Sequence, residues 1–505
     1  MPFRFHNKYP QSYRIKAFFF LFFLYIAFLL GSMLYGSSSI LNFSERSLDM
    51  LQFQDPVTST TKQTQQSIKD PLDQLIDQTD IHSSLHRILT LLQQQQQSRT
   101  HYDLNNDIID PEIETARCQK YGFEYKGRTK RRRIFFGSLL ADDSWHTIAT
   151  NAIEGYGLYH TVAFAESDVT TSDRGEFMQN RTLRFAEGSF DLSVMQSGIF
   201  GPSTQVYVDQ YIDDPKKRTD EYGRIHYQQE HIQRDISLDR FRESGMTNED
   251  VVIFADIDES FSRDFLVASQ ICEIPQFEPG QNCHKPKIVA KTLIFESAPD
   301  CISADRLWYH PDMMIGECVD EIGDSSIHTP GKRLFLDRGS RLEGYGRKPN
   351  DYANMPNTTM YPLWRPIDFR NTGGADGLTS DHHNHPIGFH FHNFFSSMKV
   401  MRHKYFTYGH ANKDAFTMRL DETHNDLKMT LNCIRGIYDV KDPKQRPLEG
   451  GFDAIQGATP IAFQDAIYRK KRFMELGVMI SEDERIVEQR RKDEKKAENL
   501  AGSVP

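Results

Sequence analysis

The pattern of apolar and polar positions changes period repeatedly through the middle of the chain. Short runs of β-branched and aromatic residues alternate with longer segments of helical spacing, which is typical of an α/β sheet with parallel strands. Ser144 stands at a position that favours the N-cap of a helix. We expect strands over 134–136, 160–166, 206–208 and 251–255, and helices over 144–155 and 231–244.

The N-terminus follows another pattern. Residues 17–35 form an uncharged, mostly apolar stretch that is long enough to span a bilayer as one helix. Residues 1–16 contain Lys and Arg but no acid, so the positive-inside rule predicts a cytosolic tail, a single transmembrane signal anchor and a lumenal remainder. A cleaved signal peptide is the alternative, because small residues follow at 36–39.

The lumenal part divides by composition. Residues 36–130 are rich in Ser, Thr, Gln and Asp and predict a stem with short amphipathic helices, which can support a homodimer. The main domain is expected over 131–470 and a charged tail, helical or disordered, over 471–505. The basic run at 126–133 is interpreted either as a solvated segment or as a processing site near Arg131.

Charge and cysteine content narrow the class of protein. The 505 residues carry a net charge of −10, which argues against a general nucleic-acid binder. Six cysteines follow the apolar stretch and none forms a Cys-x-x-Cys pair, so disulfides in an oxidising compartment are expected rather than a zinc ribbon. Their pairing is open, although Cys272 and Cys283 are placed to close a small loop.

Candidate chemistry follows the strand predicted at 251–255. The next acidic residues are Asp256, Asp258 and Glu259. In an extended chain Asp256 and Asp258 point the same way, roughly 6–7 Å apart, and Glu259 points to the opposite face. Two carboxylates placed in this way can share Mn²⁺ or Mg²⁺ with a diphosphate, which is the Asp-x-Asp arrangement of nucleotide-sugar transferases. A solvated acidic turn is the alternative interpretation.

A histidine cluster lies downstream, with five histidines between residues 382 and 392. Imidazole is a good ligand for Mn, Fe and Zn. His390 and His392 share a face if this segment is a strand. The cluster alone predicts either a metal-dependent oxygenase or hydrolase, or a set of histidines that are only hydrogen-bonded.

Four segments follow one another along the chain: AESDVT at 165–170, EDVVIFADIDE at 249–259 with Arg234 before it, GFHFHNF at 388–394 and LNCIRG at 431–436. In this order they resemble glycosyltransferase family 17, whose members add β1,4-linked N-acetylglucosamine to the core mannose of N-glycans. The resemblance covers about residues 131–440. Phe389 and His392 stand where the family usually has Trp and Ser, and residues 300–385 have no counterpart, so the resemblance defines the acceptor less closely than the donor.

The resemblance implies a GT-A-like domain, a Rossmann-like mixed sheet, behind the anchor and stem. Its implied reaction is transfer of N-acetylglucosamine from UDP-GlcNAc, with inversion to a β linkage, to a glycan acceptor such as the mannose of an N-glycan. Asp258 would bind Mn²⁺ (or Mg²⁺) directly and Asp256 would reach the ribose or the metal shell, so both are catalytic candidates. His390 would complete the metal site.

Further roles are implied for residues outside the acidic pair. Arg234 and Arg435 are candidates for the diphosphate, because guanidinium pairs well with phosphate oxygens, and ordinary ion pairs are the alternative. Glu166 would hold the uridine or ribose, or else is a capping or solvated acid. Inversion needs a carboxylate base. The candidates are Glu317 and Asp376, with Asp320, Glu321 and Asp381 as alternatives.

These features together predict a single-pass type II enzyme of the Golgi membrane with a lumenal catalytic domain. Its expected partners are a UDP-sugar donor and a glycan acceptor on a glycoprotein, and no nucleic acid. Two other classes stay open: the oxygenase or hydrolase centred on the histidines, and a non-catalytic lectin-like module that keeps the fold without the chemistry.

Overall fold

The computed structural model describes residues 109–170, 178–214, 228–277, 287–323, 363, 366, 386–407, 425–436, 446–455 and 459–501. All of them belong to the second of two compact units, Pro71–Pro505. None of the helices in these ranges is long and apolar enough to cross a membrane. The anchor predicted at 17–35 and most of the predicted stem lie outside the described residues.

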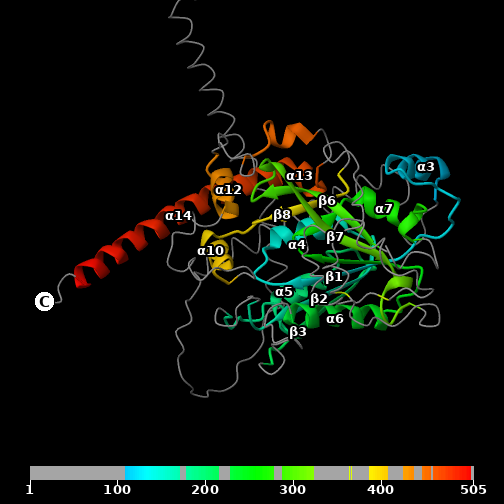
Figure 1. Ribbon diagram of the computed structural model, residues 1–505, viewed down its shortest axis with the longest axis horizontal. Helices are drawn as coiled ribbons and strands as arrows, with labels where there is room; N and C mark the ends of the chain where they lie inside the picture. The colour runs from blue at the N-terminus through cyan, green and yellow to red at the C-terminus, as the bar shows by residue number, and fades with distance from the viewer. Residues whose placement is uncertain are drawn as a thin grey trace, which may run out of the picture. The chain divides into compact units, whose positions relative to one another are not determined.

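One mixed sheet organises the described residues (Figure 1). Its eight described strands run in the order β3-β2-β1-β4-β7-β6-β8-β5. The strands are β1 (Ile134–Leu140), β2 (Tyr159–Ser167), β3 (Gln205–Tyr211), β4 (Val251–Asp256), β5 (Glu259–Phe261), β6 (Lys287–Glu296), β7 (Ile302–Ile315) and β8 (Gly388–His392).

The half of the sheet formed by β3, β2, β1 and β4 is parallel throughout. This confirms the predicted α/β class, and each strand predicted in this part of the chain is present. β1 lies between β2 and β4, so the direction in which strands are added reverses at β1. In open α/β sheets such a switch point is where ligands bind, beyond the carboxyl ends of the strands.

The other half is largely antiparallel. β7 pairs antiparallel with β4 and β6, and β5 pairs antiparallel with β8, whereas β6 and β8 are parallel. β5 follows β4 directly in sequence but lies at the far edge of the sheet order, paired with a strand more than a hundred residues later. The two halves therefore form a mixed sheet that is compatible with a Rossmann-like fold.

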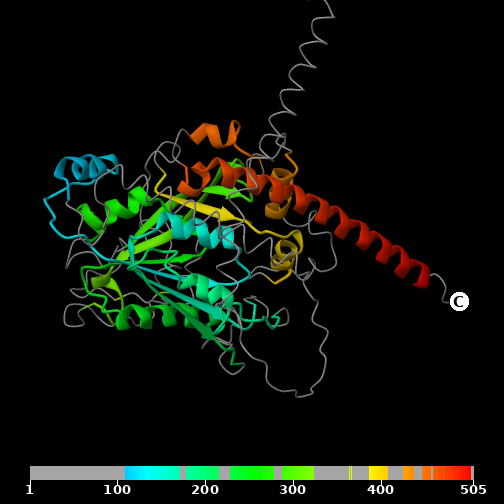
Figure 2. The ribbon, with the colours of Figure 1, turned by 180° about the vertical axis from the view of Figure 1, so that it is seen from behind.

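Helices cover both sides of the parallel half, with α6 on one side and α4 on the other (Figures 1 and 2). Phe241 of α6 packs its ring against Phe135 and Phe254. The described helices are α3 (Pro111–Lys120), α4 (Trp145–Glu154), α5 (Phe190–Met195), α6 (Gln228–Glu243), α7 (Arg263–Ile271), α10 (Met398–Thr407), α12 (Asn425–Ile434), α13 (Ile461–Gln464) and α14 (Ala466–Ala501).

The two helices predicted from sequence are close to the observed ones. The Ser144 hydroxyl accepts a hydrogen bond from the Thr147 amide at the start of α4, so the predicted N-cap is confirmed. The helix expected over 231–244 is α6, which begins three residues earlier. Helix α4 carries its signal locally, in the cap residue Ser144 and in the spacing of its apolar side chains.

The folded unit begins before the boundary predicted near residue 131. Helix α3 is tied to it by the Cys118–Cys272 disulfide, so Cys272 does not close a loop with Cys283. The basic run is solvated in its first part, where Lys126, Thr129 and Lys130 are exposed. Its last residues are held by the domain. Arg131 contacts Glu114, and the buried Arg132 donates to the backbone oxygen of Cys272.

Helix α14 crosses the boundary predicted at residue 470 and confirms that the charged C-terminal segment is helical. Its first half packs on the domain, where Asp483 is buried and accepts hydrogen bonds from Arg402 and Arg435. A second disulfide, Cys301–Cys433, joins the segment before β7 to α12. The C-terminal helices are therefore part of the core structure.

Candidate functional site

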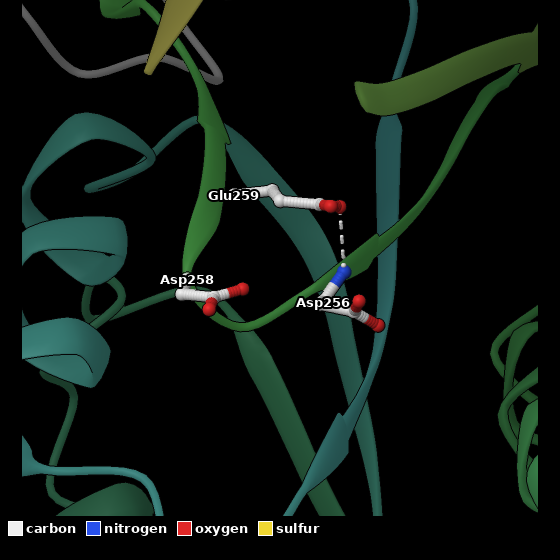
Figure 3. Close-up of side chains that lie close together, drawn as sticks. All are labelled: Asp256, Asp258 and Glu259. Atoms are coloured by element: carbon white, nitrogen blue, oxygen red, sulfur yellow. Dashed lines mark hydrogen bonds between the residues drawn. The ribbon is translucent and has the colours of Figure 1, made fainter. Parts of the chain in front are cut away.

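Three carboxylates meet at the carboxyl end of β4, beside the switch point of the sheet (Figure 3). Asp256, Asp258 and Glu259 each place one oxygen within 4.8 Å of the others. Asp256 is the most exposed, at 44% of its side chain, Asp258 is 17% exposed and Glu259 is fully buried. Carboxylate oxygens at this spacing fit a hard divalent cation such as Mn²⁺ or Mg²⁺.

The path of the backbone explains why Glu259 joins the cluster. β4 ends at Asp256, the chain turns through Ile257 and Asp258, and β5 starts at Glu259. The Glu259 carboxylate returns to the start of the turn and accepts a hydrogen bond from the Asp256 amide at 2.9 Å. The expectation that Glu259 faces away from the cluster is wrong, because the side-chain alternation of a continuous strand does not apply across a turn.

A tryptophan from β7 fixes the other side of the Glu259 carboxylate. The Trp308 indole nitrogen donates to Glu259 Oε1 at 2.6 Å. The same indole ring stacks on the His390 imidazole, with 4.9 Å between ring centroids. Glu259 is therefore a buried carboxylate whose two oxygens accept N–H groups from different elements, which gives it one fixed position.

His390 lies beside this cluster, as expected. The register of β5 and β8 pairs it with Glu259, and its Nε2 is 3.5 Å from Asp258 Oδ2. Burial acts to raise the pKa of Asp258, but the His390 and Lys404 charges outweigh it, so this pKa lies below its usual value. His390 Nδ1 is buried without a hydrogen-bond partner in the part of the chain that the structure describes, so this imidazole has capacity for a further contact.

His392 follows on the same face of β8 and has a different setting. Its Nδ1 lies 2.7 Å from an oxygen of the fully buried Glu296, whose other oxygen accepts from Thr430 at 2.8 Å. The His390 and His392 ring centroids are 5.3 Å apart. The remaining histidines of the sequence cluster, between residues 382 and 385, lie outside the described residues.

Asp143 lies close enough to the cluster for its carboxylate to interact electrostatically with Asp258, and the sequence analysis did not select it. It follows β1, the central strand of the parallel half, and its carboxylate accepts from the Ala141 amide at 2.7 Å. Burial, and then the charge of Asp258, raise the pKa of Asp143 to about 6. Its place in the sequence, shortly after a predicted strand, could have identified it. The carboxyl ends of the parallel strands β1 and β4 lie at the same edge of the sheet.

The expected donor-binding residues have other partners in this structure. Both oxygens of the Glu166 carboxylate accept backbone amides, from Arg184 at 2.8 Å and Phe185 at 2.9 Å, so Glu166 holds a loop over the end of β2. Arg435 forms an ion pair with Asp483 of α14 at 2.6 Å. Of the three, Arg234 reaches the acidic cluster, and it does so by contacting Asp256.

The candidate bases are not brought to the cluster by the described residues. β7 runs antiparallel to β4 and its Ile315 pairs with Val251, so Glu317 lies at the opposite end of the sheet, about 17 Å from Asp256 along the strand. This corrects the expectation that Glu317 acts at the cluster. Asp320 and Glu321 follow it at the same end, and Asp376 and Asp381 lie outside the described residues.

The site therefore consists of three carboxylates and one imidazole, framed by Trp308 and Arg234 and open on the side of Asp256. Such a set can hold a divalent cation against a polyanionic ligand at the switch point of the sheet. Comparison of the chain with family models, with curated proteins and with solved structures finds no match, so the resemblance to glycosyltransferase family 17 stays a prediction.

Proposed function

We propose that the protein is a metal-assisted glycosyltransferase that uses a nucleotide-sugar donor on a GT-A-like sheet. The observation that carries the proposal is the acidic cluster of Asp256, Asp258 and Glu259, which lies beyond the carboxyl end of a parallel strand at a topological switch point. A nucleoside diphosphate needs charge compensation when it leaves, and this cluster has the oxygen ligands for the cation that supplies it.

The chain's own residues have distinct roles in this proposal. Asp258 and Glu259 would hold Mn²⁺ (or Mg²⁺), which when bound neutralises charge that develops on the diphosphate. Glu259 is fixed by Trp308, and Asp258 by its position against His390. Asp256 is the most exposed of the three and is placed to contact the nucleotide.

The substrates are proposed from the sequence. The resemblance to glycosyltransferase family 17 supports UDP-GlcNAc as donor, an inverted β linkage, and the mannose of an N-glycan as acceptor. The predicted anchor and stem support a type II protein of the Golgi membrane whose stem can mediate homodimers. The anchor and most of the stem lie outside the described residues, so the proposal there depends on the apolar and polar pattern alone.

Release of UDP tests the proposal. The full-length chain is assayed with UDP-GlcNAc, UDP-GalNAc, UDP-Gal and UDP-Glc against a panel of N-glycan acceptors, with Mn²⁺ or with saturating EDTA. We expect Mn²⁺-dependent turnover of UDP-GlcNAc that Asp258→Ala abolishes while the protein stays folded. Asp239→Ala, on the surface of α6, is the control. Full activity in EDTA or in Asp258→Ala contradicts the mechanism.

A further inference from the structure

His310 is a histidine outside the acidic cluster that the proposed function does not use. It stands on β7 with 15% of its side chain exposed, and its Nδ1 lies 2.6 Å from Oδ2 of Asp312. Asp312 is fully buried, and its other oxygen accepts a hydrogen bond from Lys287 Nζ at 2.9 Å. Because the carboxylate is itself held in the core of the sheet, the imidazole has a defined orientation.

The pairing of β7 with β4 brings His310 to the edge of the sheet where the acidic cluster lies. The ladder between the two strands includes the pair Phe254 and Asp312. Asp256 lies two residues further along β4, and His310 lies two residues further in the same direction along the antiparallel β7. Since neighbouring strands are about 4.8 Å apart, His310 stands at the same end of the sheet as Asp256.

A β-bulge changes the course of β7 at this point. Two ladder pairs, Val289 with Asp312 and Lys291 with Tyr309, enclose one residue of β6 but two residues of β7. His310 is the first of these two. An extra residue of this kind bends the strand and redirects a side chain, and such bulges are frequent next to active sites.

Trp308 connects His310 with the acidic cluster. Its indole nitrogen donates to Glu259, and its ring contacts the His310 imidazole with 5.8 Å between ring centroids. The same indole stacks on His390. His310 therefore lies one side chain away from the cluster, on the side of the site that Trp308 borders.

The partner of Nδ1 decides the chemistry of the other ring nitrogen of His310. A carboxylate beside an ammonium group accepts hydrogen bonds, so Nδ1 carries the proton and donates to Asp312. In the neutral imidazole Nε2 then has the lone pair. Among the described residues Nε2 has no hydrogen-bond partner. His310 can therefore accept a proton from a ligand.

We propose that His310 is the general base of the transfer reaction and that Asp312 is the positioning residue that orients it; this inference rests on the proposed function. His310 Nε2 takes the proton of the acceptor hydroxyl while that oxygen forms a bond to the anomeric carbon of the donor sugar. The bond from this carbon to the diphosphate oxygen breaks, and its electron pair leaves with UDP. The imidazolium then releases the proton to water.

His310→Ala in the full-length chain tests the base. With saturating Mn²⁺, UDP-GlcNAc and an N-glycan acceptor, we expect kcat to fall about 100-fold, whereas binding of UDP in Mn²⁺ changes by about twofold at most. Free imidazole should raise the rate of the variant by about tenfold, because a small base can replace the missing side chain. An unchanged kcat would overturn the proposal, and so would a loss of kcat that imidazole does not reverse.

Two further variants control for structure and for effects of imidazole on Mn²⁺. His160→Ala is the matched control, because His160 lies at the amino end of β2, at the opposite edge of the sheet. It should keep the natural kcat and show no rise with imidazole. His310→Gln keeps the size of the side chain and should lose about 100-fold in kcat without responding to imidazole, so it serves if His310→Ala does not fold.

Asp312→Asn tests the positioning role through its dependence on His310. We expect kcat to fall about tenfold in the natural background and not to fall further in His310→Ala, because the two residues act as one unit. Equal losses in the two backgrounds would show that Asp312 only supports the structure. If Asp312→Asn does not fold, the pair Lys287→Met and Asp312→Asn removes both buried charges and serves for the same comparison.

These measurements separate this inference from the proposed function. If the natural chain turns over none of the UDP-sugars, the proposed function fails and the general base fails with it. If the natural chain is active and His310→Ala matches its kcat, the proposed function stands and the assignment of His310 is wrong.

Discussion

The two halves of the sheet use their surfaces differently. In the parallel half the central strands are buried on both faces, between α6 and α4, and polar groups appear where strands end. In the antiparallel half one face of β8 packs Phe389 and Phe391 into an apolar cluster. Of the residues that alternate with them, His390 pairs with Glu259 beside the acidic site and His392 contacts the buried Glu296. The parallel half thus contributes polar groups to the site from the ends of its strands, and the antiparallel half contributes them from one face of a strand.

This difference suggests a division of tasks. The strand ends of β1 and β4 place acids by backbone position. The register of the parallel strands sets Asp256, and Asp143 follows β1 and accepts a hydrogen bond from the Ala141 amide. The polar face of β5 and β8 sets the remaining groups by direct contacts between side chains, such as Trp308 with Glu259. The site depends on both halves, and substitutions in each half should have different signatures.

The largest effect should come from Glu259→Gln. This substitution keeps the size of the side chain but removes a buried charge at the junction of the two halves. We expect UDP release to fall at least about 100-fold, because one electrostatic group of a preorganised site typically contributes this much. Steady-state assays would measure it, with the exposed Glu243→Gln of α6 as control. Near-normal activity would remove Glu259 from the site and restore the two-aspartate interpretation.

Alanine substitutions at two glycines, one in each half of the sheet, would compare how tightly the two halves are packed. A Cβ at Gly388 of β8 would lie 2.7 Å from the Ser260 backbone oxygen, whereas at Gly137 of β1 the nearest atoms, at 2.9 to 3.1 Å, belong to the rings of Phe254 and Phe241. Backbone cannot move as easily as a ring. We expect Gly388→Ala to lower the free energy of unfolding by about 3 kcal/mol and Gly137→Ala by about 1 kcal/mol. Urea unfolding would measure both free energies. A larger loss of stability in Gly137→Ala than in Gly388→Ala would mean that the parallel half is the more rigid one.

A smaller effect is expected from Trp308→Phe. The phenyl ring keeps much of the stacking on His390 but loses the hydrogen bond to Glu259 Oε1. We expect activity to fall about tenfold and the free energy of unfolding to fall by about 2 kcal/mol, since one hydrogen bond to a charged group contributes about 1.5–3 kcal/mol to stability. Trp145→Phe, in the parallel half, is the matched control. An unchanged rate would show that Glu259 does not depend on the indole for its position.

The smallest effect concerns Glu154, a buried carboxylate at the end of α4. It accepts backbone amides from Arg263 at 2.9 Å and Ile461 at 2.6 Å, yet burial raises its pKa to about 7. A folded-state pKa above the unfolded value of 4.5 means that this group's contribution to stability is present below pH 4.5 and is lost as pH rises through 7. We expect the loss to be about 2 kcal/mol between pH 5 and pH 7.5.

Urea unfolding of the natural chain and of Glu154→Gln at the two pH values would measure this contribution. The natural chain should lose more stability than the variant, because the amide does not titrate. An equal loss would show that other groups carry the pH dependence.

The parallel half could be predicted from sequence because its signals are local. β2 and β4 are apolar runs that end on acids, and Ser144 marks the start of α4. The antiparallel half could not, because its order depends on pairings such as β5 with β8 that join distant segments, and on the irregular register between β6 and β7. Backbone pairing of this kind leaves no periodic signal in either segment.

The candidate site was predictable to a similar extent. Asp256 and Asp258 follow from the end of β4, and the resemblance placed His390 beside Asp258, as observed. Glu259 was misassigned because the turn after Asp256 cannot be read from an apolar pattern. Arg234 was expected at the donor, and the structure shows its guanidinium on Asp256, which only tertiary contacts could reveal.

The Cys118–Cys272 disulfide has a consequence for proteolysis. It joins two cysteines 154 residues apart, and the basic run at 126–133 lies between them. A protease that cut after Arg131 would break the chain but would not free the domain, because the N-terminal fragment would stay attached through Cys118. Cleavage there would appear on a gel only after reduction of the disulfide. Release of the domain without reduction requires a cut before residue 118. A non-reducing gel therefore distinguishes cleavage before Cys118 from cleavage between Cys118 and Cys272.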